Sequence, residues 1–367
     1  MRVLISGGGT GGHVFPAIAI ADALRALEPE VELLFVGALG KLEMERVPKA
    51  GYPIKGLWIS GFHRSWRWSN LLFPLKLGSS LFKAAGILQR FKPDVAVGVG
   101  GYASGPTLYL AARKGIPTLI QEQNSFPGVT NRLLSKYADR ICVAYEGMER
   151  FFPAGKILLT GNPVRAAISE SKLTRDEALK HFGLDASRKT IFVVGGSLGA
   201  RTFNQALAGQ QQFIDAHKDV QILWQTGKLY WETYKDHPVA RHPRVKALPF
   251  VDRMDLAYVA ADVVVSRAGA LSVSELMLAG KAVLFVPSPN VAADHQTKNA
   301  EALVRQKAAK MITDAEAADL LLPKSLELLE DEEERKRLEK NIRQLAKPHA
   351  AEQIAREVLN LAKALKK

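Results

Sequence analysis

A strand, a glycine turn and a helix follow one another in Val3-Leu4-Ile5, Ser6-Gly7-Gly8-Gly9-Thr10-Gly11-Gly12-His13 and the helical pattern over 16–27. Such a turn brings backbone N–H groups close to an anion, and the helix N-terminus adds about half a positive charge. A second glycine turn, Gly195-Gly196-Ser197-Leu198-Gly199, follows the strand-like run Ile191-Phe192-Val193-Val194. This duplication predicts two strand–loop–helix halves, each with a phosphate-facing loop.

Short apolar runs alternate with helical patterns through both halves, which predicts parallel sheets covered by helices. The predicted strands are 3–6, 31–36, 94–99, 118–121 and 140–144 in the first half, and 191–194, 221–224, 245–248, 262–266 and 282–286 in the second. Ligands of such folds bind beyond the carboxyl ends of the strands, where both glycine loops lie. We therefore expect an α/β protein with two Rossmann-like domains that face each other across a cleft.

The length of 367 residues fits two domains of roughly 100 to 200 residues. Glycine and proline interrupt the pattern in Gly161-Asn162-Pro163-Val164-Arg165, which predicts domains over 1–163 and 164–344. The remaining segment, about 345–367, carries apolar residues at helical spacing, among them Ile354 and Val358. We expect this helix to pack on one of the domains, and packing back on the first is one option.

The formal net charge of +13 restricts the partners of the chain. Residues 1–163 hold 19 Lys and Arg against 11 Asp and Glu, so most of the excess lies in the first half. Such a field attracts phosphates, nucleic acid or an anionic membrane surface, and charge alone does not choose among them.

The single cysteine, Cys142, lies in a strand-like run and excludes an internal disulfide. We expect it to be a core residue in a reducing compartment. Met1 leads directly into a strand, and no uninterrupted apolar stretch reaches the about 18 residues of a membrane span. These features predict a protein that stays on the cytoplasmic side.

Residues 55–92, the basic aromatic stretch, hold seven Lys and Arg and no Asp or Glu. Trp favours the headgroup level of a bilayer, and each Lys or Arg near an anionic surface contributes about 1 kcal/mol. The stretch has two open interpretations, a surface that lies on a membrane and an ordinary amphipathic helix with a basic outer face. Nucleic acid is disfavoured because no RNA- or DNA-binding motif accompanies the charge. The aromatic residues are Trp58, Phe62, Trp66, Trp68, Phe73, Phe82 and Phe91.

The glycine loops do not fit two common nucleotide chemistries. Gly7-x-Gly9-x-x-Gly12 matches the dinucleotide pattern, but Glu32 opens its strand and Phe35-Val36-Gly37-Ala38-Leu39 has no acid for the ribose. Neither loop ends in Gly-Lys-Ser/Thr, which argues against a P-loop and ATP hydrolysis.

The second half adds a strand that turns through Gly269 into a helix carrying Glu275. A carboxylate there accepts two hydrogen bonds from a ribose cis-diol while the helix N-terminus faces phosphate. The alternative is that Glu275 only complements its helix dipole. Asp294-His295-Gln296-Thr297-Lys298-Asn299 opens another helix on the ligand side and suits sugar hydroxyls, although capping alone explains Asp294.

The combined motifs resemble the MurG family, the lipid-linked N-acetylglucosaminyltransferases of peptidoglycan synthesis, from residue 1 to about 300. The matching segments are Gly7 to His13, Gly98-Val99-Gly100-Gly101-Tyr102-Ala103-Ser104-Gly105, Gln121-Glu122-Gln123-Asn124, Gly161 to Arg165, Gly195-Gly196-Ser197, Arg267 to Glu275 and His295-Gln296. The resemblance implies a glycosyltransferase-B fold, a UDP-N-acetylglucosamine donor held mainly by the second domain, and undecaprenyl-diphospho-N-acetylmuramoyl-pentapeptide as the acceptor met by the first. It also implies a peripheral enzyme on the cytoplasmic face of the bacterial inner membrane.

The resemblance assigns roles to individual positions. The donor contacts that it implies are Thr10, Gly11, Gly12, Asn124, Arg165, Ser197, Val251, Ala270, Leu271, Ser272, Val273, Ser274, Glu275 and Gln296. The loops for the acceptor diphosphate would contain Gly8, Gly9, Gly100, Gly101 and Tyr102.

Transfer from an α-linked UDP-sugar to a β-glycoside inverts the anomeric carbon, so a base is needed for the acceptor hydroxyl. His13 is our candidate because histidine titrates near neutral pH, and a capping or phosphate-positioning role is its alternative. Glu122 is the second candidate, with buried pairing as its alternative. The sequence has no Asp-x-Asp, so we expect no metal and no cofactor, with Ser197, Arg165 and helix dipoles stabilising the leaving group.

Two other functions share part of this pattern. A UDP-N-acetylglucosamine 2-epimerase would have the same fold and donor without a lipid acceptor, and the basic aromatic stretch argues against it. A UDP-sugar-binding membrane protein without catalysis is the alternative from a different class.

Overall fold

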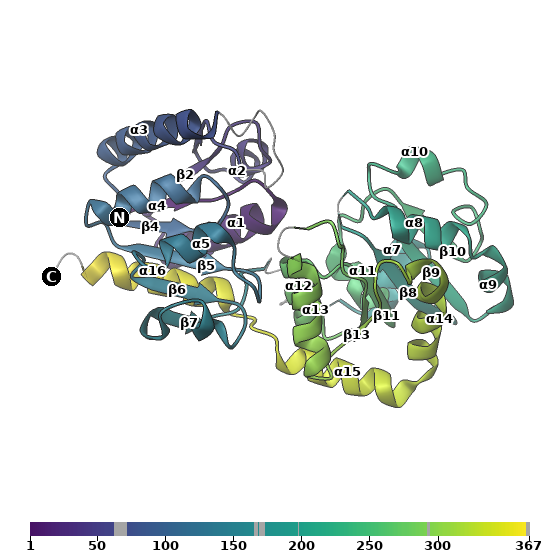
Figure 1. Cartoon of the computed structure of the whole chain (residues 1–367). Coiled ribbons are helices and arrows are strands. Elements are labelled where there is room, and N and C mark those ends of the chain that lie inside the picture. The colour runs from purple at the N-terminus through teal and green to yellow at the C-terminus, as the bar shows by residue number, and fades with distance from the viewer. Residues whose placement is uncertain (62–71, 165–167, 169–172, 197, 292–293, 365–367) are drawn as a thin grey trace. The chain divides into compact units, whose positions relative to one another are not determined.

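The computed structural model describes residues 1–61, 72–164, 168, 173–196, 198–291 and 294–364. The chain forms two compact units, one of residues 1–164 and 349–367 and the other of residues 165–348 (Figure 1). Each unit contains one parallel sheet with helices on its faces. The α/β architecture predicted for both halves, a parallel sheet covered by helices, is confirmed.

The first unit has a seven-stranded sheet in the order β3-β2-β1-β4-β5-β6-β7. Its strands are β1 (Arg2–Ser6), β2 (Glu32–Ala38), β3 (Ile54–Leu57), β4 (Val95–Gly98), β5 (Thr118–Glu122), β6 (Arg140–Val143) and β7 (Ile157–Leu159). The central strands are rich in Val, Ile and Leu because helices cover both faces of the sheet. Ser6 pairs with Gly98 on β4, so the loops after β1 and β4 begin at one level. Ser6 also pairs with Val36 on β2, which continues two residues further, to Ala38.

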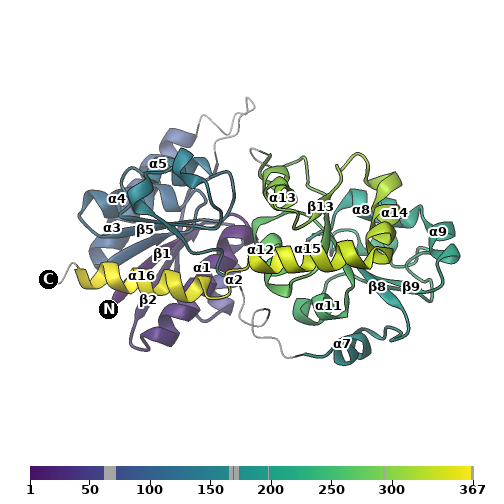
Figure 2. The ribbon, with the colours of Figure 1, turned by 90° about the horizontal axis from the view of Figure 1, so that it is seen from below.

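Helices cover the two faces of this sheet in separate groups. One core cluster joins α1 to the C-terminal helix α16, with Ile20 and Leu24 beside Ile354 and Val358, and Figure 2 shows these two helices side by side. Another joins α3, α4 and α5 on the other face, through residues such as Leu88. The helices are α1 (Gly11–Leu27), α2 (Glu43–Lys49), α3 (Phe73–Phe91), α4 (Ser104–Arg113), α5 (Val129–Leu134) and α16 (Ala350–Ala364), with the short 3-10 helices η2 (Met148–Arg150) and η3 (Ala154–Lys156).

The second unit has a six-stranded sheet in the order β10-β9-β8-β11-β12-β13. Its strands are β8 (Lys189–Val194), β9 (Val220–Gln225), β10 (Val245–Leu248), β11 (Val263–Ser266), β12 (Ala282–Phe285) and β13 (Lys310–Met311). Its helices are α7 (Arg175–Phe182), α8 (Arg201–Ala208), α9 (Gln211–Ala216), α10 (Trp231–Tyr234), α11 (Met254–Ala260), α12 (Ala270–Ala279), α13 (His295–Arg305), α14 (Ala317–Glu330) and α15 (Glu332–Gln344). Val194 pairs with Gln225 on β9 and with Ser266 on β11, so the loops after β8 and β11 also start at one level.

All ten predicted strands are present, with ends that differ from the prediction by at most two residues. Sequence analysis missed β3, β7 and β13, which lie at the sheet edges and are only two to four residues long. The first helix was predicted to begin at residue 16, but α1 begins at Gly11 and contains Pro16 in its second turn. Cys142 is fully buried, as expected of a core residue.

Among the described residues, no helix combines the length and the apolar character that a bilayer span requires.

Candidate active site

The glycine loop after β1 is held by hydrogen bonds to β2, to the loop after β4 and to Glu43 at the start of α2. The N–H of Gly7 donates to the carbonyl of Val36 at 3.2 Å, and that of Gly8 donates to the carbonyl of Gly100 at 3.3 Å. The N–H of Gly9 donates to Oε2 of Glu43 at 2.8 Å. Gly8 and Gly9 were expected to face a diphosphate, but their N–H groups hold the loop in place instead. The N–H groups of Gly11 and Gly12 lie in the first turn of α1, where no intrahelical acceptor exists, and are better placed for an anion.

Glu43 is a buried anchor that sequence analysis missed. Its side chain is 1% exposed, and its Oε1 accepts the N–H of Ala38 at 2.8 Å. A Cβ on Gly8 or Gly37 would overlap the Glu43 side chain, so both glycines are needed for the close approach of this carboxylate. The sequence held one signal that could have identified Glu43, namely an acidic residue shortly after β2 in a half of the chain that has few acidic residues.

His13 lies in the first turn of α1 and meets the loops after β4 and β5. Its Nδ1 lies 3.1 Å from Oε1 of Gln123, and its ring packs against Gly100, where a Cβ would lie 3.0 Å from Cε1. Gly100 and Gly101 both have positive φ, and a Cβ on Gly101 would overlap the carbonyl of Gly8. Tertiary structure therefore brings His13 together with Gly8, Gly100 and Gly101, and a contact of these loops with an acceptor diphosphate stays a prediction.

Tyr102 follows these glycines and is half exposed, with its ring against Gly61.

Glu122 ends β5 and is 2% exposed. Its Oε1 accepts from the N–H of Asn124 at 3.0 Å and from Nδ2 of Asn124 at 3.2 Å. Its Oε2 accepts from the N–H of Gly128 at 3.1 Å and from Nδ2 of Asn131 at 2.9 Å. These four bonds occupy both carboxylate oxygens and organise the loop that leads into α5. The geometry favours the buried alternative for Glu122 over a role as base.

Gln225, at the end of β9, connects the glycine loop after β8 to Val251, one of the predicted donor contacts. Nε2 of Gln225 donates to the carbonyl of Gly196 at 2.8 Å, and its Oε1 accepts the N–H of Val251 at 2.8 Å. Gly199 has positive φ and packs against the backbone of Gly227. Val251 is thus brought next to the loop, and its N–H is already used within the unit. Ser197 and Arg165, two expected donor contacts, lie outside the described residues.

The helix α12 begins beside this loop, because β11 pairs with β8. Gly269 is its extended N-cap residue, and Glu275 lies in the second turn with an 8% exposed side chain. The hydroxyl of Tyr258 donates to Oε2 of Glu275 at 3.2 Å and orients the carboxylate. The run from Ala270 to Ser274 forms the first turn and a half, with the Ser274 hydroxyl bonded to the carbonyl of Ala270 at 3.0 Å. Within this run, Leu271 and Ser272 are partly exposed and Val273 is buried.

The loop after β12 is fixed by Arg267 and Gln296. Nη1 of Arg267 donates to the carbonyls of Val286 at 2.9 Å and Pro287 at 3.1 Å, and it pairs with Asp314 at 2.5 Å. Oε1 of Gln296 accepts the N–H of Ser288 at 2.9 Å. Gln296 therefore shapes the loop that follows the strand, besides any contact with a ligand.

Asp294 has positive φ, and its Oδ1 accepts from the hydroxyl of Thr297 at 2.7 Å. Asp294 is thus the residue before α13, but its side chain accepts a hydrogen bond from a side-chain hydroxyl and does not cap a backbone N–H of the helix.

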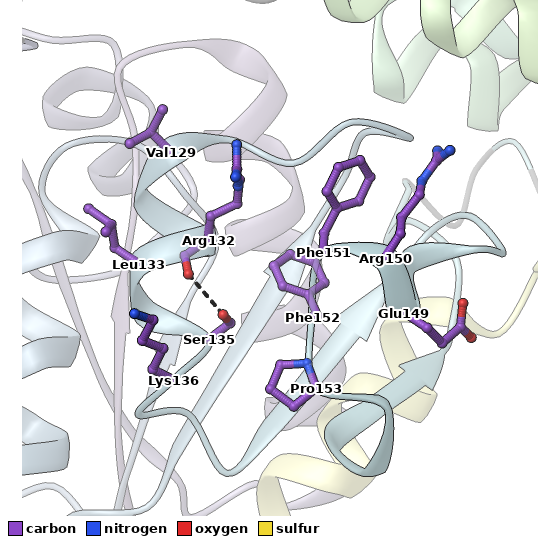
Figure 3. Close-up of a pocket in the computed structure, with 10 residues that line it drawn as sticks. All are labelled: Val129, Arg132, Leu133, Ser135, Lys136, Glu149, Arg150, Phe151, Phe152 and Pro153. Atoms are coloured by element: carbon purple, nitrogen blue, oxygen red, sulfur yellow. Dashed lines mark hydrogen bonds between the residues drawn. The ribbon is translucent and has the colours of Figure 1, made fainter.

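A pocket of about 680 Å³ lies elsewhere in the first unit, between α5 and the segment 149–153 (Figure 3). Its lining combines the cationic Arg132, Lys136 and Arg150 with apolar side chains such as Leu133 and Phe151. None of the predicted site residues lines it. The candidate site is therefore defined by the loops at the carboxyl ends of the strands and not by this pocket.

In the part of the chain that the structure describes, no group of three His, Cys, Asp or Glu side chains is arranged to hold a metal ion.

Comparisons with known proteins agree with the two-unit architecture. Residues 3–143 match the glycosyltransferase family 28 N-terminal domain, and residues 190–356 match the C-terminal domain of the same family. A relative from Bacteroides fragilis, named UDP-N-acetylglucosamine–N-acetylmuramyl-(pentapeptide) pyrophosphoryl-undecaprenol N-acetylglucosamine transferase, is 54% identical over 99% of this chain and 96% of its own. A relative of the same name from Flavobacterium psychrophilum is 52% identical over 100% of this chain and 99% of its own.

Among solved structures, MurG of Acinetobacter baumannii superposes with a TM-score of 0.76 at 30% identity, covering 98% of this chain and 99% of that one. The sequence matches and the structural match each cover both units of the chain. The chain therefore belongs to glycosyltransferase family 28 and, within it, to the MurG family.

Proposed function

We propose that this enzyme transfers N-acetylglucosamine from UDP-N-acetylglucosamine to the 4-hydroxyl of undecaprenyl-diphospho-N-acetylmuramoyl-pentapeptide, a step of peptidoglycan synthesis. The observation that carries the proposal is the 54% identity, over 99% of the chain, to a relative named for this transfer. The match of both units to the corresponding family domains supports the same activity.

The donor is assigned to the second unit. The N-terminus of α12 and the loop after β8 start at one level of the sheet, so both can face a diphosphate with N–H groups and a positive helix end. Glu275, oriented by Tyr258, would accept hydrogen bonds from the ribose diol. Val251 and Gln296 would contribute to donor binding by shaping the loops to which they are hydrogen-bonded. Arg165 and Ser197 complete the assignment by resemblance.

The acceptor is assigned to the first unit, where the loops after β1 and β4 meet. The loop of Gly100, Gly101 and Tyr102 would meet its diphosphate. Thr10 and the N–H groups of Gly11 and Gly12, at the start of α1, would keep the donor contacts that the resemblance implies. The acceptor oxygen attacks the anomeric carbon, the bond from that carbon to the UDP oxygen breaks, and UDP leaves with the electron pair. The hydroxyl proton passes to His13 as the base. Glu122 positions Asn124 through two hydrogen bonds.

The first unit would also contact an anionic membrane surface. The helix α3 buries Ala84 and Leu88 on one side and exposes Leu75 and Phe82 on the other, and Phe82 is 86% exposed. Together with Lys76, Lys83 and Arg90, this outer face has the composition of an interfacial helix. Phe62, Trp66 and Trp68 of the basic aromatic stretch lie outside the described residues. We place the enzyme as a peripheral protein on the cytoplasmic face of the inner membrane.

A transfer assay tests the proposed reaction. The protein is incubated with labelled UDP-N-acetylglucosamine and the lipid-linked acceptor, and label is expected in the lipid fraction. Label that stays on nucleotide, or that appears as UDP-N-acetylmannosamine, would overturn the proposal. A His13→Ala variant that binds UDP-sugar normally but turns over at the parent rate would remove His13 as the base.

Flotation with vesicles tests the membrane surface. Phe82→Ser should weaken binding to vesicles with anionic lipid, whereas Leu198→Ser, at an exposed position of the second unit, should not. Equal binding of Phe82→Ser and the parent protein would contradict the proposed surface.

A further inference from the structure

Three buried amide side chains form a connected chain behind His13. Gln121, Gln123 and Asn162 are each at most 3% exposed. Nε2 of Gln123 donates to the carbonyl of Val99 at 2.8 Å and contacts Oε1 of Gln121. Nε2 of Gln121 donates to Oδ1 of Asn162 at 2.9 Å. Nδ2 of Asn162 donates back to the carbonyl of Gln123 at 3.0 Å, which closes the chain.

The two backbone carbonyls at the ends determine how each amide is oriented. A backbone carbonyl only accepts hydrogen bonds, so the NH₂ group of Gln123 must face Val99 and that of Asn162 must face the Gln123 carbonyl. If the Gln123 amide were reversed, its oxygen would face the Val99 carbonyl and leave two buried acceptors against each other, which costs about 1–3 kcal/mol. Gln121 is then oriented by its neighbours on both sides.

This orientation leaves Oε1 of Gln123 as the atom that faces His13, 3.1 Å from Nδ1. An amide oxygen cannot donate, so Nδ1 of His13 must carry the proton of the neutral ring. In a neutral imidazole the other nitrogen, Nε2, is then the one with the basic lone pair.

We propose that Gln123 is a positioning residue that holds the ring proton of His13 on Nδ1 and so selects Nε2 as the atom that takes the acceptor proton. The tautomer follows from the hydrogen-bond geometry, and only the catalytic use of Nε2 rests on the proposed function. Gln123 contacts neither donor nor acceptor in this proposal.

Nitrogen NMR tests the tautomer without any turnover. The protein is labelled with ring-¹⁵N histidine, and the signals of His13, one of eight histidines, are assigned by their loss in His13→Gln. Above the pH at which the ring titrates, the parent protein should show a protonated Nδ1 and an unprotonated Nε2. A protonated Nε2, or a mixture of the two tautomers, would overturn the proposal even if no Gln123 variant folds.

Variants connect the tautomer to the rate. In Gln123→Leu, which removes the acceptor, the Nδ1–H preference should disappear, and kcat should fall about 10²-fold with little change in KM for the UDP-sugar. Gln221→Leu is the matched control, because Gln221 is a buried amide that bonds to Asp185 and Thr190 in the second unit. It should keep both the His13 tautomer and kcat. Retention of the Nδ1–H tautomer in Gln123→Leu would refute the positioning role.

The outcomes separate this proposal from the proposed function. A parent protein with the expected tautomer that transfers no label to lipid would contradict the function and leave the role of Gln123 in the tautomer intact. A parent protein that transfers label but holds the proton on Nε2 would contradict the role of Gln123 alone.

Discussion

Replacing Glu43 should loosen the glycine loop that leads into α1. Its carboxylate accepts two backbone N–H groups at 2.8 Å, from Gly9 and Ala38, while 1% exposed. Each hydrogen bond to a charged group contributes about 1.5–3 kcal/mol, and Glu43→Ala removes both. We therefore expect the free energy of unfolding of the first unit to fall by about 3–6 kcal/mol. Glu43→Gln keeps the volume but turns an NH₂ group toward one donor, so a loss of about 1.5–3 kcal/mol is expected.

Urea unfolding combined with hydrogen exchange and peptide mass spectrometry would measure this effect, because exchange reports each unit separately. The peptides that contain Gly9 and Ala38 should exchange faster in both variants. Glu45→Gln is the control on the same helix, since Glu45 forms an exposed ion pair with Lys49 and should change stability by less than about 1 kcal/mol. If Glu43→Ala matched Glu45→Gln in stability and in exchange, the assigned role of the buried carboxylate would be refuted.

Four further outcomes are expected. Glu275→Gln should weaken binding of UDP about tenfold by calorimetry, because a neutral amide replaces a charged acceptor for the ribose diol; an unchanged Kd would contradict this contact. Burial, with a smaller contribution from Glu357, raises the pKa of the Cys142 thiol to about 12, so a thiol reagent at neutral pH should label it only after unfolding. Rapid labelling of the native protein would show that this strand opens. Turnover should persist in EDTA, and a loss that magnesium restores would argue for a metal-bound diphosphate. The hydrogen bonds from Arg253 lower the pKa of Asp255. The stability from this pair should thus be present above the normal carboxyl pKa and be lost as the pH falls through the lowered value. In Arg253→Leu, acid unfolding should show a smaller loss over this range, and an unchanged acid profile would contradict the assignment.

Local pattern was enough to specify the architecture of both halves. Apolar runs of four to six residues, each followed by a helical period, identified ten strands, because all of these except the edge strand β10 are almost wholly buried. Glycines after β1 and β8 located the two loops, since both loops contain positive φ values that other residues rarely adopt. The missed strands β3, β7 and β13 are edge strands, where a short segment needs only one neighbour and leaves little periodic signal.

The positions of functional side chains depended on contacts that no local pattern contains. Gly9 and Glu43 are 34 residues apart, and His13 and Gln123 are 110 residues apart, yet each pair is joined by a hydrogen bond. The strand order β2-β1-β4-β5 brings them together, because it places the loops that follow these strands along one edge of the sheet.

The same contacts give two carboxylates a shared role that the sequence does not show. Sequence analysis did not single out Glu43 and proposed Glu122 as a candidate base, whereas both are buried acceptors of backbone N–H groups. The packing of α16 against α1 has the same origin, since helical periodicity shows that a helix has an apolar face but not which surface covers it. Glycine turns and hydrophobic periods are properties of neighbouring residues and are therefore readable from the chain. Hydrogen-bond partners and buried charges are properties of the folded sheet edge, and they exist only after distant segments have come together.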